Sequence, residues 1–489
     1  MNSVAELVKG LSHKRIHIVG FSSAEGSAVL EFLLLHKVDC DLTLHDSYPK
    51  ENLLKTFQES HKELTAEESD EKFRFITSLP YQYHYADEYL AGIETAEIIF
   101  VTQAWSIYKN NAPLKLLQGK IPFLTMTNLY FDLSPCEIIG VTGTNGKSST
   151  AKLISEMFEA SELKSYFAGN DRLNKQVLDR LDEMKKGENF VLEISNRQLM
   201  GLEKSPNIAV YTNVTQDHID DHGSYDEYIA VKRKLTAFQN KTDTAILNLD
   251  DAIVSGFADT SPSQNLFYTL GNSLPKGKNG AYVHDGQIVL SINNQTTPIL
   301  AIDEMWQKGK HNVANAMAAS LTAFLAGIPV SIIKNVLKTS TGLRYRNQFV
   351  KTIRGVDYYN DLNSTVPEAT IAAFSSFDDR GIYLIVGGED KGLNYSPLAQ
   401  AISEYKVKKV LALPGNGTDK ILAALEAVDS PQGLVEHFNT LDEVVRFADA
   451  NASEGDVVLL SPACAYFFSR YTKLVTEGDE SWLNVLTAQ

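Results

Sequence analysis

The chain has 489 residues, of which 44% are hydrophobic and 22% are charged, as expected for a globular protein with several domains. The formal net charge of −16 argues against a nucleic-acid or anionic-membrane surface, because phosphate-rich partners require a basic patch. The three cysteines, Cys40, Cys136 and Cys464, lie far apart in the sequence, so we expect no disulfide, no four-cysteine zinc site and a cytoplasmic location. No apolar run approaches the ~18 residues that a membrane span needs.

The first 130 residues predict strands that alternate with helices. A helical pattern at 22–36 lies between two short apolar segments, which is how a Rossmann-like βαβ unit begins. The loop after the first segment lacks G-x-G-x-x-G, so the dinucleotide-binding fingerprint is absent. An acidic run at 57–72 is interpreted as a solvated helix or a surface loop, with no role assigned. The strands of this region are expected at 15–20, 40–46, 96–102 and 121–126.

The centre of the chain opens with a strand, a glycine-rich loop and a helix, in the stretch "EIIGVTGTNGKSST" (137–150). An Asp-Gly pair within 282–292 predicts a hairpin, and a long helical pattern ends at Gly327 before Pro329. Beyond a linker at 340–348, strands and helices alternate again. The chain is therefore predicted to be an α/β protein of three domains, at 1–130, 131–342 and 343–489. Further strands are expected at 190–195, 208–214, 244–250, 356–361, 382–388, 407–415 and 456–462.

The glycine-rich loop has the features of a phosphate cradle. Its glycines allow backbone N–H groups to close on phosphate oxygens, and the following helix directs its positive end toward the anion. Lys147 would reach the β- and γ-phosphates and Ser148 would ligate Mg²⁺. The standard pattern G-x-x-x-x-G-K-[ST] places a glycine where this chain has Val141, and glycines stand instead at Gly140 and Gly143. Because this glycine spacing differs from the standard one, it restricts the families of nucleotide-binding proteins to which the loop can belong.

The loop resembles the "GTNGK[ST]" loop of the Mur ligases and folylpolyglutamate synthetases, which are ATP-dependent enzymes that form amide bonds. The segments "NVTQDHIDDH" (213–222), "YIAVKRK" (228–234) and "KGKHNVANAMAA" (308–319) are similar to further motifs of this family. The resemblance implies a Rossmann-like N-terminal domain that binds a UDP-sugar, a P-loop ATPase-like central domain and a Rossmann-like C-terminal domain that binds an amino acid.

The same resemblance assigns roles to individual residues. It implies ATP and Mg²⁺ as cofactors, with two Mg²⁺ sites, one of them through a carbamylated lysine. The catalytic residues would be Lys147, His218, Lys232 and Arg346. ATP would be bound by Gly143, Thr144, Asn145, Gly146, Lys147, Ser148, Asn312, Asn315, Arg346 and Asp361. Mg²⁺ would be held by Ser148, Glu193, His218 and carbamylated Lys232, and the substrates by Ser22, Ser23, Asp46, Asn170, Asn213, Thr365, Lys391 and Tyr466.

Several features indicate which branch of the family the chain resembles. Asn145 in the loop, about 130 preceding residues, and the motifs "GGEDKG" (387–392) and "LLSPACA" (459–465) favour the branch that adds glutamate to UDP-N-acetylmuramoyl-L-alanine. D-glutamate is the expected substrate. The chain departs from the pattern at Tyr466, where serine is usual, and at Thr102-Gln103-Ala104, where Ser-Pro-Gly is usual. L-glutamate therefore stays open as an alternative.

Two other functions remain as alternatives. A P-loop regulatory NTPase would hydrolyse ATP without joining an acceptor, and a catalytically idle protein would only bind the UDP-sugar. Asp217, His218, Asp220, Asp221 and His222 could also suggest a zinc hydrolase, although Mg²⁺ with oxygen ligands fits the phosphate loop better. The expected partners are UDP-N-acetylmuramoyl-L-alanine and glutamate, with no nucleic acid, no membrane and a monomeric state.

Overall fold

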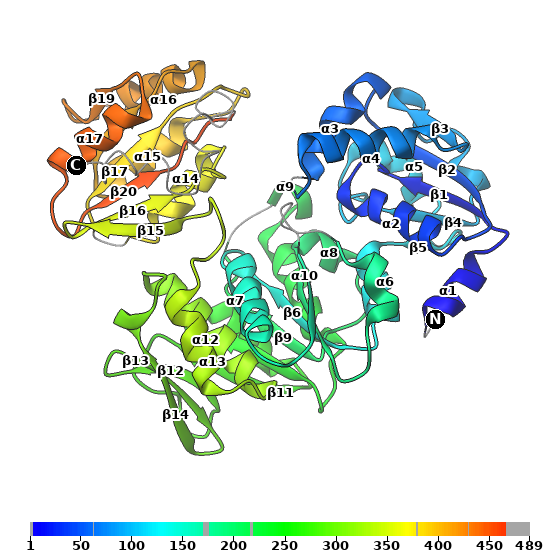
Figure 1. Ribbon diagram of the computed structural model, residues 1–489, viewed down its shortest axis with the longest axis horizontal. Coiled ribbons are helices and arrows are strands. Elements are labelled where there is room, and N and C mark those ends of the chain that lie inside the picture. The colour runs from blue at the N-terminus through cyan, green and yellow to red at the C-terminus, as the bar shows by residue number, and fades with distance from the viewer. Residues whose placement is uncertain are drawn as a thin grey trace. The chain divides into compact units, whose positions relative to one another are not determined.

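The computed structural model describes residues 3–61, 63–169, 176–215, 219–377, 380–428 and 430–465 (Figure 1). The chain divides into two compact units, Met1–Ala301 with Ala314–Val336, and Ile302–Val313 with Leu337–Gln489. The described residues form sheets of five, nine and six strands whose neighbouring strands are mostly parallel. The predicted α/β class is confirmed, whereas the division into three domains stays a prediction. No helix among the described residues is both long and apolar enough to cross a membrane.

The five-stranded sheet is parallel throughout and has the order β3-β2-β1-β4-β5. The chain moves outward from β1 to β3 on one side and then crosses to β4 on the other. In an open parallel sheet, such a reversal leaves a crevice at the carboxyl ends of the two strands that flank it. The strands are β1 Arg15–Val19, β2 Asp41–Asp46, β3 Gln82–Tyr85, β4 Ile98–Val101 and β5 Phe123–Leu124. The helices are α1 Val4–Leu11, α2 Ala24–Leu35, α3 Leu53–Ser60, α4 Ala66–Ser78, α5 Ala112–Lys115 and α6 Met126–Leu133.

The acidic run at 57–72 lies mostly in α3 and α4. Each helix packs an apolar side chain inward, Phe57 from α3 and Ile76 from α4, while Gln58 donates a hydrogen bond to Asp70 between them (3.1 Å). Thr65 begins α4 with a capping box, in which its side chain and that of Glu68 satisfy each other's backbone N–H groups. The segment is thus mainly helical.

The nine-stranded sheet has the order β14-β13-β12-β11-β10-β9-β6-β8-β7. It is parallel from β7 to β12 and antiparallel beyond. The predicted hairpin is confirmed between β12 and β13, where Asp285 and Gly286 both have positive φ. The strands are β6 Glu137–Thr142, β7 Ser165–Ala168, β8 Asn189–Glu193, β9 Ile208–Tyr211, β10 Thr244–Asn248, β11 Gln264–Thr269, β12 Gly280–His284, β13 Gln287–Ile292 and β14 Gln295–Ala301. The helices are α7 Lys147–Glu159, α8 Asn196–Met200, α9 Ile219–His222, α10 Tyr225–Ala237, α11 Ala252–Gly256, α12 Lys310–Leu325 and α13 Val330–Thr339.

One apolar core joins the two sheets of the first unit. Buried side chains from both sheets, such as Phe100 and Tyr211, belong to the same cluster. On α6, Tyr130 packs edge-on against Phe190 of β8, with ring centroids 5.1 Å apart, and its hydroxyl accepts a hydrogen bond from the N–H of Val177 (3.1 Å). The two sheets of the first unit therefore share buried apolar surface.

The second unit contains the six-stranded sheet, with the order β15-β16-β20-β17-β18-β19. Only the β15–β16 pair is antiparallel. The strands are β15 Gln348–Ile353, β16 Val356–Asn360, β17 Ile382–Val386, β18 Val407–Ala412, β19 Val435–His437 and β20 Val457–Leu460. The helices are α14 Pro367–Phe374, α15 Ser396–Glu404, α16 Asn416–Ala427 and α17 Leu441–Asn451.

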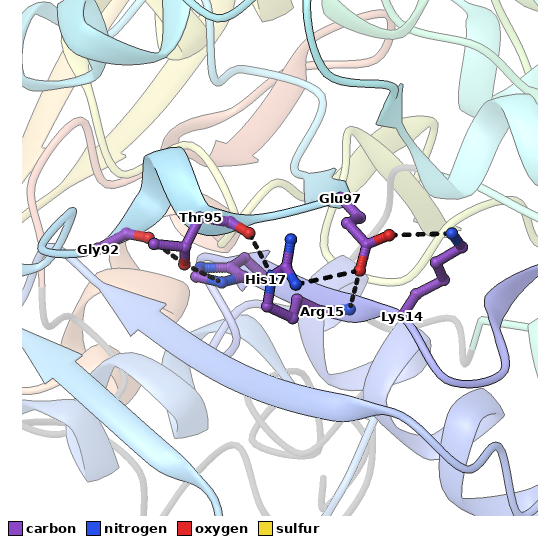
Figure 2. A network of polar contacts seen from close by, with 6 residues as sticks. All are labelled: Lys14, Arg15, His17, Gly92, Thr95 and Glu97. Carbon is purple, nitrogen blue, oxygen red and sulfur yellow. Dashed lines mark hydrogen bonds and ion pairs between the residues drawn. The ribbon is translucent and has the colours of Figure 1, made fainter.

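Buried histidines connect the first two strands of the five-stranded sheet. Nδ1 of His45 contacts the carbonyl oxygen of Tyr89, which can only accept, so this nitrogen must carry the proton. Nε2 of neutral His45 is then an acceptor, and Nδ1 of His17 donates to it at 2.8 Å. Figure 2 shows the other end of this network, where Thr95 lies beside His17 and Glu97 binds Lys14 and Arg15. Only one of the two facing ring nitrogens can carry a proton, so the two histidines cannot both be charged.

We expect this histidine pair to make the first unit sensitive to acid. Burial lowers the pKa of His17 to about 4 and that of His45 to about 3, from about 6.5 in an unfolded chain. The unfolded chain therefore binds more protons, so the stabilisation is complete above pH 6.5 and is lost as pH falls toward 4. Each histidine should lower the free energy of unfolding by about 1 kcal/mol at pH 5.5.

Thermal melts between pH 7.5 and 5 measure this effect. His17→Gln should give a shallower fall of Tm with pH than the unmodified protein. His13→Gln is a matched control, because the side chain of His13 is 82% exposed. Equal slopes for the His17 variant and the unmodified protein would contradict the assignment.

Candidate active site

The glycine-rich loop lies at the end of β6, between the neighbouring strands β8 and β9. Gly143 has φ of +151°, and a Cβ there would collide with the hydroxyl of Thr212 and the backbone of Asn213. Gly146 has φ of +82°, and a Cβ there would collide with the amide of Asn315. Val141 is fully buried within β6, so the position of the usual first glycine belongs to the strand. Glycine is required where the loop turns, at Gly143 and Gly146.

The segment after β9 holds this loop in place. Its Asn213 accepts hydrogen bonds from the N–H of Thr144 through its carbonyl oxygen (2.7 Å) and from the N–H of Asn145 through Oδ1 (2.9 Å). Nδ2 of Asn213 returns a bond to the carbonyl of Asn145 at 3.0 Å. The hydroxyl of Thr212 donates to the same carbonyl. The structure therefore brings Asn213, predicted near the substrate, against the phosphate loop.

Helix α7 begins at Lys147, directly after the loop, so its positive end faces the cradle. Nζ of Lys147 donates to the carbonyl of Thr144 at 2.7 Å, which keeps the ammonium beside the loop. The hydroxyl of Ser148 donates to Oε1 of Glu193 at 2.7 Å, and the hydroxyl of Thr150 donates to Asn315 at 3.2 Å. Lys147, Ser148, Glu193 and Asn315 are thus gathered around one loop.

Glu193 has the chemistry of a metal ligand. It ends β8 and is only 4% exposed, and its buried Oε2 has no hydrogen-bond partner among the residues that the structure describes. A buried carboxylate oxygen without a partner is costly, and a cation beside it would remove that cost. Together with the hydroxyl of Ser148, Glu193 offers hard oxygen ligands, which suit Mg²⁺.

Lys232 lies on α10 and is hydrogen-bonded to the start of the loop. It is 1% exposed, and its Nζ donates to the carbonyl of Gly143 at 2.8 Å and to the hydroxyl of Thr142 at 3.2 Å. The ring of Tyr228 lies below it, 5.4 Å from Nζ to the ring centroid. Lys232 is therefore buried against the phosphate loop.

Two of the residues that could suggest zinc, Asp221 and His222, have other partners. Asp221 forms an ion pair with Arg197 at 2.8 Å, and Nε2 of His222 contacts the amide of Asn196 at 2.8 Å. Among the described ranges, no group of three or more His, Cys, Asp or Glu side chains is placed to hold a metal. His218 and Asp217 lie outside the described residues.

The predicted UDP-binding residues meet at the ends of β1 and β2. The hydroxyl of Ser22 donates to Oδ2 of Asp46 at 2.6 Å, and Asp46 is buried, which raises its pKa. Ser23 caps α2, with its side chain accepting from the N–H of Gly26 at 3.1 Å. Behind the loop, the hydroxyl of Ser60 donates to the carbonyl of Ser22 at 3.1 Å. The last residue of α3, in the acidic run, thus supports this loop. Asn170 lies outside the described residues.

The second unit gathers a different set of predicted residues. Asp361 is 2% exposed and accepts hydrogen bonds from the N–H of Asn347, next to Arg346, and from the hydroxyl of Ser461, both at 2.8 Å. Burial raises the pKa of Asp361 to about 6. Thr365 follows four residues later, and Lys391 is exposed on the loop after β17. Asn312 also belongs to this unit and donates to the carbonyl of Lys308 at 2.8 Å. Tyr466 lies outside the described residues.

Sequence patterns missed Thr212 and Tyr228, which take part in building the loop. The hydroxyl of Tyr228 lies 3.0 Å from that of Thr144, and Thr212 bonds the carbonyl of Asn145. Both are nearly fully buried. A polar residue directly after a buried strand could have signalled Thr212, but Tyr228 reads as an ordinary core aromatic.

Comparisons with known proteins agree with these observations. Residues 141–323 match the profile of the Mur ligase middle domain, and residues 345–464 match that of the Mur ligase glutamate ligase domain. The chain is 35% identical over 349 residues to a UDP-N-acetylmuramoylalanine–D-glutamate ligase from Thermoanaerobacter pseudethanolicus, covering 71% of this chain and 75% of that protein. A protein of the same name from Acetivibrio thermocellus is 31% identical over 467 residues, covering 94% and 93%.

The fold is similar to that of solved structures with much lower sequence identity. A UDP-N-acetylmuramate–alanine ligase from Thermotoga maritima superimposes with a TM-score of 0.53 at 16% identity, covering 95% of this chain and all of that one. At this identity the likeness bears on the fold alone.

Proposed function

The chain belongs to the Mur ligase family of ATP-dependent enzymes that form amide bonds, and from that premise we propose that it joins D-glutamate to UDP-N-acetylmuramoyl-L-alanine. The reaction would serve the synthesis of peptidoglycan precursors. The observation that carries the proposal is the match to D-glutamate ligases over up to 94% of the chain. The names of these relatives favour D-glutamate over the L-glutamate alternative.

The central site supports a role for ATP and Mg²⁺. The phosphates of ATP would bind to the N–H groups of the loop Gly143–Gly146 and to Lys147, at the positive end of α7. Mg²⁺ would be held by Ser148 and Glu193, with His218 and a carbamate on Lys232 completing two sites. When bound, Mg²⁺ neutralises phosphate charge and polarises the transferring group.

The reaction would proceed in two steps. The carboxylate of the L-alanine residue attacks the γ-phosphorus of ATP, so a carboxyl–phosphate bond forms while the bond to the bridging oxygen breaks and ADP leaves. The amine of glutamate then attacks the acyl carbon, an amide bond forms, and phosphate leaves with the electron pair while the amine loses a proton. Lys147 and Arg346 would stabilise the charge on the transferring phosphoryl group.

The residues assigned to the amino acid support the second step. Lys391 is exposed and suited to a carboxylate of glutamate, and Thr365 offers a hydroxyl in the same unit. Asp361 would lie at the ribose and Asn312 and Asn315 at the base of ATP. Ser22, Ser23 and Asp46 would hold the UDP end of the sugar nucleotide, and Asn170, Asn213 and Tyr466 would contact the substrates.

Phosphate release with UDP-N-acetylmuramoyl-L-alanine and ATP tests the proposed function. We expect phosphate release with D-glutamate and at least a hundredfold slower release with L-glutamate. Without an amino acid we expect no release, because phosphate leaves only when an amine attacks the acyl phosphate. Mass spectrometry of the product should show one added glutamate residue.

Two outcomes would contradict the proposal. Release only with L-glutamate would reverse the assigned stereochemistry. Release at the same rate without any amino acid would favour a regulatory NTPase over a ligase.

A further inference from the structure

The loop after β4 forms one wall of the crevice at the end of the five-stranded sheet. A Cβ at Gly20 would lie 2.9 Å from Cγ2 of Thr102, so the loops that follow β1 and β4 are in close contact. This is where the strand order reverses, and ligands of open parallel sheets bind at such a place. Residues 102–104 therefore border the loop that carries Ser22 and Ser23.

A buried carboxylate fixes the backbone of this wall. Glu25, in the first turn of α2, is 8% exposed, and its Oε2 accepts a hydrogen bond from the N–H of Gln103 at 2.7 Å. Burial raises the pKa of Glu25 to about 7. The bond is short, so the backbone of Gln103 is anchored to α2, which starts at the crevice.

The side chain of Gln103 reaches the other sheet. Its Oε1 accepts a hydrogen bond from the hydroxyl of Ser195 at 2.7 Å, and Ser195 is 6% exposed. Ser195 follows β8 by two residues and caps α8, with its side chain also accepting from the N–H of Gln198 at 3.2 Å. The residue between, Ile194, donates its N–H to Val141 of β6 at 2.8 Å.

Gln103 therefore links the wall of the crevice to the end of β8, where Glu193 lies. Its backbone is bonded to Glu25 on α2, and its side chain is bonded to Ser195 at the start of α8, two residues after β8, within one compact unit. A substrate whose UDP end lies at the first crevice must present its carboxylate near Glu193. An error of about 1 Å in that placement can cost a hundredfold in rate.

We propose that Gln103 is a positioning residue that fixes the distance between the sugar-nucleotide crevice and the end of β8, where Glu193 lies. This inference rests on the proposed function and adds a residue to it. Gln103 would act through Ser195 and the 102–104 backbone.

The test is the steady-state kinetics of Gln103→Met, which keeps the side-chain length but removes the acceptor for Ser195. We expect the KM for UDP-N-acetylmuramoyl-L-alanine to rise about tenfold, as for a lost buried hydrogen bond, with the KM for ATP and for D-glutamate unchanged. Gln103→Glu restores an acceptor and should recover most of the affinity.

Controls separate positioning from a general loss of structure. Gln118→Met, on an exposed position of the same sheet's connections, should match the unmodified protein in all three KM values. A uniform rise of all KM values in Gln103→Met, an unchanged KM for the sugar nucleotide, or a glutamate variant no better than methionine would overturn the inference.

Calorimetric titration with UDP-N-acetylmuramoyl-L-alanine distinguishes this inference from the proposed function. Unmodified protein that binds the compound but makes no product would contradict the function, while weaker binding by Gln103→Met would still support the inference. Unmodified protein that does not bind the compound would overturn both.

Discussion

Lys147→Ala should lower the kcat for ATP-dependent amide formation by roughly 10²–10³-fold, as expected when a group that stabilises transition-state charge is removed. Lys147 holds its ammonium 2.7 Å from the carbonyl of Thr144, at the first position of α7. Among the described residues of α7, no other lysine or arginine bonds a carbonyl of this loop. Phosphoryl transfer depends almost entirely on positioning and charge, so the remaining N–H groups should not compensate.

Lys152→Ala provides the matched control for this measurement. Lys152 lies on the same helix and pairs with Glu156 on its surface at 3.5 Å. Its replacement should leave kcat within about twofold, as surface pairs contribute little. Equal activity of Lys147→Ala and Lys152→Ala, with equal Tm values, would remove the phosphate-loop assignment.

Lys232→Arg should be as inactive as Lys232→Met, with a loss of about a hundredfold or more. Arginine retains a cation and hydrogen-bond donors for the carbonyl of Gly143, but it is larger than lysine at a position that is 1% exposed, so the comparison is made at an unchanged Tm. It cannot form the carbamate that would supply oxygen ligands to Mg²⁺. The arginine variant therefore separates a structural ammonium from a modified lysine.

Carbon-13 NMR with labelled bicarbonate measures the modification directly. A carbamate resonance should be present in the unmodified protein and absent in Lys232→Arg, and a short carboxylic acid should restore part of the rate of Lys232→Ala. Near-normal activity of Lys232→Arg, or full activity of the unmodified protein without a carbamate signal, would contradict this role.

The features that the sequence predicted best are those formed by residues close together in the chain. The strand, loop and helix around Lys147 are contiguous, and their glycines, strand pattern and helix start are all local signals. The strands that place Glu193 and Asn213 were also predictable, because each is a short apolar run. β3 gave no such signal, since its "QYHY" is partly exposed and carries no apolar alternation.

What the sequence could not reveal were contacts between distant segments. Gln103 and Ser195 are 92 positions apart, and their hydrogen bond follows only from how the two sheets share a core. The position of Gln103 was visible as a departure from a familiar motif, but its partner was not. The shared apolar core of the two sheets in the first unit likewise joins residues far apart in the sequence, such as Phe100 and Tyr211.

Gly143 and Gly146 differ in how readily each could be replaced by a larger residue during evolution. At Gly143 a side chain would meet both Thr212 and the backbone of Asn213, so no single partner change could make room. At Gly146 the nearest obstacles all belong to one side chain, that of Asn315. A larger residue at position 146 would thus require a smaller residue at position 315. The positive φ at position 146 would still strain the backbone of the new residue. The fitness of one loop position is in this way tied epistatically to a helix far along the chain.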